Sequence, residues 1–186
     1  LVFGGTTSPS SDTTASETYN GTSFTEGNNL NTSRGNLAGA GTLTAALAFG
    51  GYNEGAEDQS AATEEYGGTS WTNGNNMNNQ RSGLAGAGIQ TAALAFGSSP
   101  PSINNDVLTE YNGSSWTSTG NLLLAIRNLG GSGTQTAGFA YGGQGPAAPL
   151  SLSQQYDGTS WVTSASLGTA RYSLNGLGET QAESDL

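Results

Sequence analysis

The sequence predicts an all-β fold in which one small antiparallel sheet is repeated four times. Its only basic side chains are four arginines that recur 47, 46 and 44 residues apart, namely Arg34, Arg81, Arg127 and Arg171. A self-similar period in the forties is typical of solenoids and propellers. Glycine-bounded apolar runs recur in the same phase, and no stretch has sustained helical periodicity. Four short strands per unit describe the four-stranded blade of a β-propeller.

Each repeat begins with its arginine and an inner strand of small residues, followed by an apolar strand that ends in glycine. In the first complete repeat these segments are 34–41 and 45–51. Short apolar runs bounded by turn residues are typical of buried strands. Glycines of the inner strand, such as Gly39, Gly41, Gly86 and Gly88, would let neighbouring strands approach closely near a narrow axis.

The second half of each repeat is predicted to be a hairpin. Its turn is Asn-Gly, Gly-Gly or Asp-Gly, dipeptides that tolerate positive φ at both positions of a two-residue turn. An aromatic residue at a fixed repeat position is typical of the core between blades, where its large apolar area is buried. With the arginines, the predicted structural positions are Tyr19, Tyr66, Tyr111, Tyr156, Phe24, Trp71, Trp116 and Trp161.

The repeats predict one domain over residues 1–178. Complete blades are expected at 34–80, 81–126 and 127–170, and a composite blade is expected from 171–178 together with 1–33. Joining the two chain ends in this way would close a ring and remove exposed sheet edges. A compact four-bladed ring is favoured. A larger ring shared by two chains and a fragment of a longer array are the alternatives.

The two chain ends carry further expectations. Residues 179–186 are expected to be a C-terminal tail or linker. The chain begins at Leu1 and not at methionine, which favours a segment taken from a longer protein.

The order of arginine, small-residue strand, aromatic-Gly-Gly, tyrosine and tryptophan resembles the kelch repeat over essentially the whole chain. This resemblance implies that the arginine begins the innermost strand and that the tyrosine and tryptophan pack between blades. Two positions depart from the pattern, because Phe24 replaces a tryptophan and Ser98 replaces a glycine. The repeats, with segments such as Leu-Ala-Gly-Ala-Gly and Gly-Thr-Ser-Trp, are also similar to kelch-like arrays in bacteriophage virion and tail appendage proteins. That similarity implies a virion or extracellular location.

Composition argues against several classes of function. The net charge is −10 and charged residues make up 10% of the chain, so a nucleic-acid partner is not expected. Docking on an anionic membrane is disfavoured for the same reason, and no apolar run is long enough to enter a bilayer. The sequence has no histidine and no cysteine, which removes the usual nucleophile–base pairs and metal ligands. We therefore expect no enzyme activity and no cofactor.

The irregular loops that follow each glycine pair differ between repeats, and a propeller would gather them on one face. Their polar residues are the candidate binding positions Tyr52, Asn53, Glu54, Glu57, Asp58, Asn104, Asn105 and Asp106. No spacing matches a calcium loop, so solvated acidic loops are the preferred interpretation.

Two further sets of residues have a structural and a functional interpretation. Each arginine is expected to pair with a carboxylate or with backbone carbonyls of a neighbouring blade, in preference to an anionic ligand, and Glu17, Glu64 and Glu110 are the available partners. Glycosylation sequons occur at Asn20, Asn31 and Asn112, and two of them coincide with the predicted hairpin turn. They are interpreted as turn chemistry, with glycosylation as the alternative in a secreted protein.

Together these observations predict a non-catalytic structural or adhesion module of a phage virion appendage or extracellular fibre. The alternatives are a lectin-like module that binds a glycan and an intracellular kelch-type scaffold for protein interaction. Protein partners or self-assembly are expected, with a surface glycan as the alternative ligand.

Overall fold

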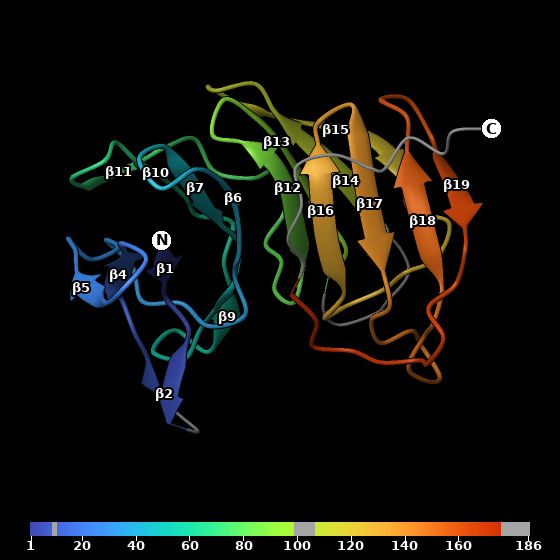
Figure 1. Ribbon diagram of the computed structural model, residues 1–186, viewed down its shortest axis with the longest axis horizontal. Helices are drawn as coiled ribbons and strands as arrows, with labels where there is room; N and C mark the ends of the chain where they lie inside the picture. The colour runs from blue at the N-terminus through green and yellow to red at the C-terminus, as the bar shows by residue number, and fades with distance from the viewer. Residues whose placement is uncertain (9–10, 99–106, 176–186) are drawn as a thin grey trace.

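The computed structural model describes residues 1–8, 11–98 and 107–175, and within these ranges the protein is all-β (Figure 1). Its 19 strands form antiparallel sheets of two to four strands, and no helix occurs in the described residues. The expected fold class is confirmed at this level. The four larger sheets follow one another along the chain, and we name them sheets I to IV.

Sheets I and II come from the first half of the chain. Sheet I contains β1 (Val2–Phe3), β4 (Ser16–Tyr19) and β5 (Phe24–Glu26). Sheet II contains β6 (Ala38–Gly41), β7 (Ala46–Phe49), β10 (Thr63–Tyr66) and β11 (Trp71–Asn73). Two short hairpins accompany them, β2 (Thr6–Ser8) with β3 (Ser11–Asp12), and β8 (Tyr52–Asn53) with β9 (Asp58–Gln59).

Sheets III and IV have the same strand order. Sheet III contains β12 (Ala85–Ile89), β13 (Ala92–Phe96), β14 (Val107–Tyr111) and β15 (Trp116–Asn121). Sheet IV contains β16 (Gly130–Thr134), β17 (Ala137–Tyr141), β18 (Ser153–Tyr156) and β19 (Trp161–Ser164). Each is an antiparallel meander in which every strand pairs with the next one along the chain.

Consecutive sheets pack face to face through their small-residue strands. Strand β6 contacts β12, and β12 contacts β16. A Cβ atom added to Gly86 would lie 2.6 Å from the carbonyl oxygen of Gly39 and 2.6 Å from Cζ of Phe49. Glycine is required at this position because the backbone and aromatic ring of sheet II leave no room for a side chain.

The sheets form an open array in the described residues, and the expected closed ring is not found there. Sheets I and IV lie at opposite ends of the long axis in Figure 1. Sheet I has three strands, none of which comes from the C-terminal segment. The described start of that segment lies on sheet IV, where the carbonyl of Arg171 accepts a hydrogen bond from Gly143 N at 2.8 Å. Residues 176–178 of the expected composite blade, and the expected tail 179–186, lie outside the described residues.

The third repeat is shifted by one residue relative to the expected alignment. Asn36 lies two residues after Arg34 and has a φ of 50°, and Asn128 lies two residues after Ile126 with a φ of 51°. Ile126, which is 1% exposed, therefore occupies the place of Arg34. The prediction that Arg127 is the equivalent repeat position was wrong.

A second exchange explains why isoleucine fits the arginine position. Glu64, the carboxylate that holds Arg34 in sheet II, is replaced by Gln154 in sheet IV. Gln154 Oε1 still accepts a hydrogen bond from a preceding backbone amide, Leu123 N, at 2.7 Å. Its Nε2 is buried without a hydrogen-bond partner among the described residues. Ile126 and Gln154, which replace the two residues of the ion pair, are both neutral, so no buried charge is left unpaired in sheet IV.

The hairpin turns are four residues long, and the expected two-residue turn was wrong. Tyr19 pairs with Phe24, and the side-chain oxygen of Asn20 accepts hydrogen bonds from Thr22 N at 2.9 Å and Ser23 N at 3.0 Å. Only the second turn residue, Gly21, takes a positive φ, of 96°. An Asn or Asp side chain that bonds its own backbone two residues on stabilises such a turn.

The same turn geometry recurs in later repeats. Asn112 repeats both side-chain contacts of Asn20, and Asp157 replaces it in sheet IV. Hydrogen bonds from the backbone of Ser160 and Thr159 hold the pKa of Asp157 below its usual value. The turn interpretation of the Asn20 and Asn112 sequons agrees with these contacts.

Candidate functional site

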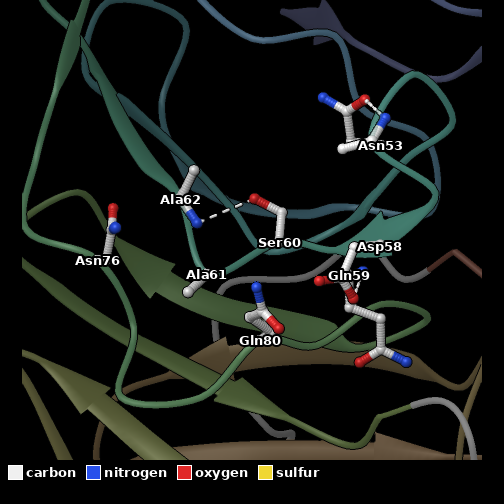
Figure 2. Close-up of a pocket in the computed structure, with 9 residues that line it drawn as sticks. Asn53, Asp58, Gln59, Ser60, Ala61, Ala62, Asn76 and Gln80 are labelled. Atoms are coloured by element: carbon white, nitrogen blue, oxygen red, sulfur yellow. Dashed lines mark hydrogen bonds between the residues drawn. The ribbon is translucent and has the colours of Figure 1, made fainter.

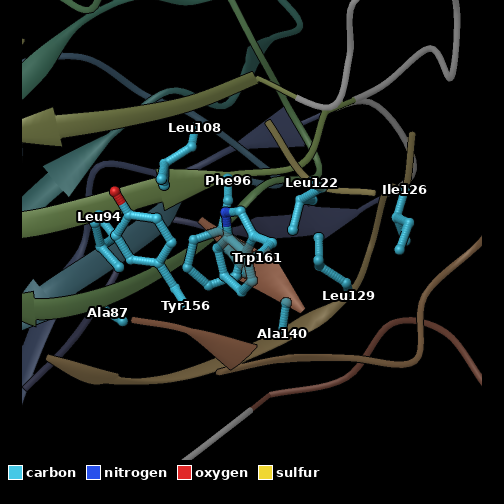
Figure 3. Packing of buried hydrophobic residues seen from close by; sticks show 11 residues of the cluster. Ala87, Leu94, Phe96, Leu108, Leu122, Ile126, Leu129, Ala140, Tyr156 and Trp161 are labelled. Atoms are coloured by element: carbon cyan, nitrogen blue, oxygen red, sulfur yellow. The ribbon is translucent and has the colours of Figure 1, made fainter. Parts of the chain in front are cut away.

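The three tryptophans lie in the core between consecutive sheets. Trp71, Trp116 and Trp161 are 5%, 5% and 4% exposed. Each packs edge-on against a phenylalanine of the preceding sheet, with ring centroids 4.9–5.2 Å apart, in the pairs Trp71–Phe3, Trp116–Phe49 and Trp161–Phe96. Figure 3 shows Trp161 and Phe96 in the cluster between sheets III and IV. These rings are not available as platforms for a ligand.

Sheet I departs from this arrangement. Tyr19 and Phe24 contact one another with ring centroids 4.9 Å apart, but both side chains are exposed. The expectation that they form inter-sheet core is wrong for the described residues, because no sheet precedes sheet I there.

Two tyrosine hydroxyls link neighbouring sheets. Tyr111 donates a hydrogen bond to Glu65 Oε1, and Tyr156 donates one to Glu110 Oε1 at 2.8 Å. Burial, together with the bond to Glu110, raises the pKa of Tyr156 to about 12. Glu110 was expected to pair with an arginine. It holds the tyrosine of the next sheet instead, because its side chain lies on the opposite face of β14 from Tyr111.

Arg34 is fully buried and forms an ion pair with Glu64, which is one of the predicted partners. Its Nη2 lies 2.9 Å from Glu64 Oε1, and its Nη1 donates to the carbonyls of Gly50 at 2.6 Å and Ala62 at 2.8 Å. Burial lowers the pKa of Arg34, and the charge of Glu64 opposes that shift. All of these contacts lie within sheet II and its loops, so the expectation that Arg34 pairs with a neighbouring blade was wrong, and this guanidinium stabilises its own repeat.

The other arginines do not share this environment. Arg81 is buried and donates to the carbonyl of Val107 at 2.7 Å and to the Thr109 hydroxyl at 2.5 Å, and burial lowers its pKa to about 10. Arg127 is half-buried, and Arg171 is exposed. Because each arginine has different surroundings, they do not form a common anion site.

The candidate loop of sheet II is held by a contact within the loop and by a contact with β3 of the preceding hairpin. Asn53 Oδ1 accepts a hydrogen bond from Ala56 N at 3.0 Å, and Glu54 N donates to Asp12 Oδ2 at 2.8 Å. Glu57 takes a positive φ of 53° in the turn between β8 and β9. No group of three or more acidic side chains is placed to hold a metal ion in the part of the chain that the structure describes. The candidates Asn104, Asn105 and Asp106 lie outside it.

The same loop borders a pocket of about 310 Å³ (Figure 2). Its lining residues are Asn53, Ala56, Asp58, Gln59, Ser60, Ala61, Ala62, Asn76 and Gln80. Sequence reasoning found Asn53 and Asp58 but did not single out Asn76 and Gln80. They lie in the connection 74–81, whose Gly-Asn-Asn-x-Asn pattern also occurs at 27–31 and was not analysed as a repeat. The lining offers amides, a hydroxyl and a carboxylate, which can bond to hydroxyl groups of a ligand.

Comparison with known proteins leaves function to be argued from this geometry. No protein-family model matches the sequence, and no curated protein matches it. In the described residues, no helix is long and apolar enough to cross a membrane.

Proposed function

We propose that the chain is a non-catalytic structural or adhesion module, built of kelch-like β-propeller blades, in a virion appendage or other extracellular fibre. The observation that carries this proposal is the use of the repeated aromatic residues. Trp71, Trp116 and Trp161 all lie in sheet-to-sheet contacts of one geometry. In repeat proteins, residues that recur with the unit hold neighbouring units together.

The proposed absence of catalysis rests on the same distribution of side chains. The sequence supplies no histidine or cysteine, and the buried ionisable pair Arg34–Glu64 is enclosed in sheet II. An enclosed pair cannot reach a substrate, so it acts on stability. The proposed location rests on the similarity of the repeats to phage appendage arrays.

Gold-labelled antibodies against this segment test the proposed location on intact particles or cells that produce the protein. We expect labelling of surface appendages without permeabilisation. Labelling only after permeabilisation would contradict the proposal and would favour the intracellular scaffold. Pre-incubation of the antibody with the purified segment is the control for specific labelling.

Glycan binding is the second candidate function, and the amide-lined pocket beside β8 and β9 is the observation that favours it. Under this alternative, a glycan-array signal of the wild-type protein is lost in Asn76→Ala. It is retained in Asn78→Ala, because Asn78 bonds the Ser118 hydroxyl at 3.2 Å and does not line the pocket. No array signal, or equal loss in both variants, would reject this pocket as a glycan site.

A further inference from the structure

One face of sheet I exposes residues that are core in the other sheets. Val2, Tyr19 and Phe24 are 56%, 48% and 57% exposed. The side chains at the same places in sheet II are buried because sheet I covers them; they are Ala48, Tyr66 and Trp71. We call the exposed surface formed by Val2, Tyr19 and Phe24 the head face.

Sheet IV ends the array with the opposite half of the same kind of interface. Phe139 and Tyr141 are only half-buried, with ring centroids 5.3 Å apart. They take the places of Leu94 and Phe96, which are fully buried under sheet IV. We call the surface formed by Phe139, Tyr141 and Gln155 the tail face.

The tyrosine hydrogen bond that links neighbouring sheets has an equivalent acceptor on the tail face. Gln155 pairs with Phe139 across the strands, as Glu110 pairs with Leu94. Glu110 accepts the hydroxyl hydrogen bond of the next tyrosine, Tyr156. An amide oxygen at the same place can accept a tyrosine hydroxyl in the same way.

We propose that a second copy of the chain packs its head face on the tail face of the first. Phe24 then lies edge-on to Tyr141, as Trp161 lies against Phe96, and the Tyr19 hydroxyl donates to Gln155. This interface continues the three internal ones between sheets I and II, II and III, and III and IV.

Charge favours the head-to-tail arrangement over a head-to-head one. The register places Glu17 beside Val2 and Glu26 beside Glu17, so two carboxylates border the head face. A head-to-head dimer would bring four carboxylates together. The strands of sheet IV carry no acidic residue. Repulsion between these like charges therefore disfavours head-to-head packing.

A head-to-tail contact joins two different surfaces, so each added copy presents a new free face. Such contacts give a ring when the rotation closes and a filament when it does not. The proposal holds in both cases and does not depend on where the protein is located. If copies do not associate head to tail, the proposed structural role still stands and is tested separately by the labelling experiment.

Sedimentation of the purified protein over a range of concentrations tests this inference. We expect the wild type to exceed the 18.7 kDa of one chain. Phe24→Asp and Phe139→Asp are each expected to sediment as single chains. Ile89→Asp is the matched control, because Ile89 is equally exposed but belongs to neither face, and it is expected to assemble like the wild type.

Mixing the two aspartate variants distinguishes a head-to-tail contact from a symmetric contact. Phe24→Asp retains an intact tail face, and Phe139→Asp retains an intact head face, so an equimolar mixture should form dimers and nothing larger. Phe24→Trp restores the tryptophan of the other repeats and should lower the dissociation constant by about fivefold through added apolar contact. A wild type that stays at the mass of one chain, a mixture that stays monomeric, or unchanged assembly of Phe24→Asp would each overturn the proposal.

Discussion

Replacing Glu64 with alanine is expected to lower the free energy of unfolding by about 3–5 kcal/mol, because it leaves a buried guanidinium without its counter-charge. Arg34 has no solvent exposure, and Glu64 is its carboxylate partner at 2.9 Å. The carboxylate also accepts a hydrogen bond from Asn31 N at 2.6 Å, which alanine cannot replace. Urea denaturation, followed by tryptophan fluorescence, measures the loss.

The chain itself suggests the control for this prediction. The double variant Arg34→Ile, Glu64→Gln copies the Ile126 and Gln154 arrangement of the third repeat. It should recover most of the stability lost in Glu64→Ala, because replacing both members of a buried ion pair by neutral groups is often close to neutral. A double variant as unstable as Glu64→Ala would show that the pair contributes more than charge balance.

Much of the local structure could be predicted because apolar periodicity and turn chemistry act over a few residues. The apolar strands that become β7, β13 and β17 are bounded by glycine and are readable in isolation. The shift at Arg127 was missed because alignment by residue type assumed that the charge is conserved. The structure instead conserves burial, which Ile126 meets without needing a carboxylate.

Ring closure and the pocket could not be predicted with the same means. Closure depends on the rotation between neighbouring sheets, a quantity that no short sequence window contains. The pocket arises where the loop carrying Asn53 approaches the connection carrying Asn76 and Gln80. Those segments are separate in sequence and have no shared motif, so only the fold brings them together.

Trp116→Ala is the second variant expected to cause a large loss, about 3–5 kcal/mol of unfolding free energy, as is typical when a buried large aromatic side chain is removed. The change removes the edge-on contact with Phe49 and the hydrogen bond that the indole Nε1 donates to Thr63 Oγ1 at 2.9 Å. Trp161 lacks a hydrogen-bond partner for its indole nitrogen within the described chain, so Trp161→Ala should cost about 1 kcal/mol less. Urea denaturation compares the two.

Phe24→Ala occupies the same repeat position and is the control that separates sequence position from environment. Phe24 is exposed on the head face, so its removal should change the stability of a dilute, unassembled chain by no more than about 0.5 kcal/mol. If Trp116→Ala leaves the free energy of unfolding unchanged, this tryptophan does not hold neighbouring sheets together, and the structural proposal loses its main support. If Phe24→Ala lowers the free energy of unfolding only at concentrations at which copies associate, Phe24 packs between chains as Trp116 packs between sheets.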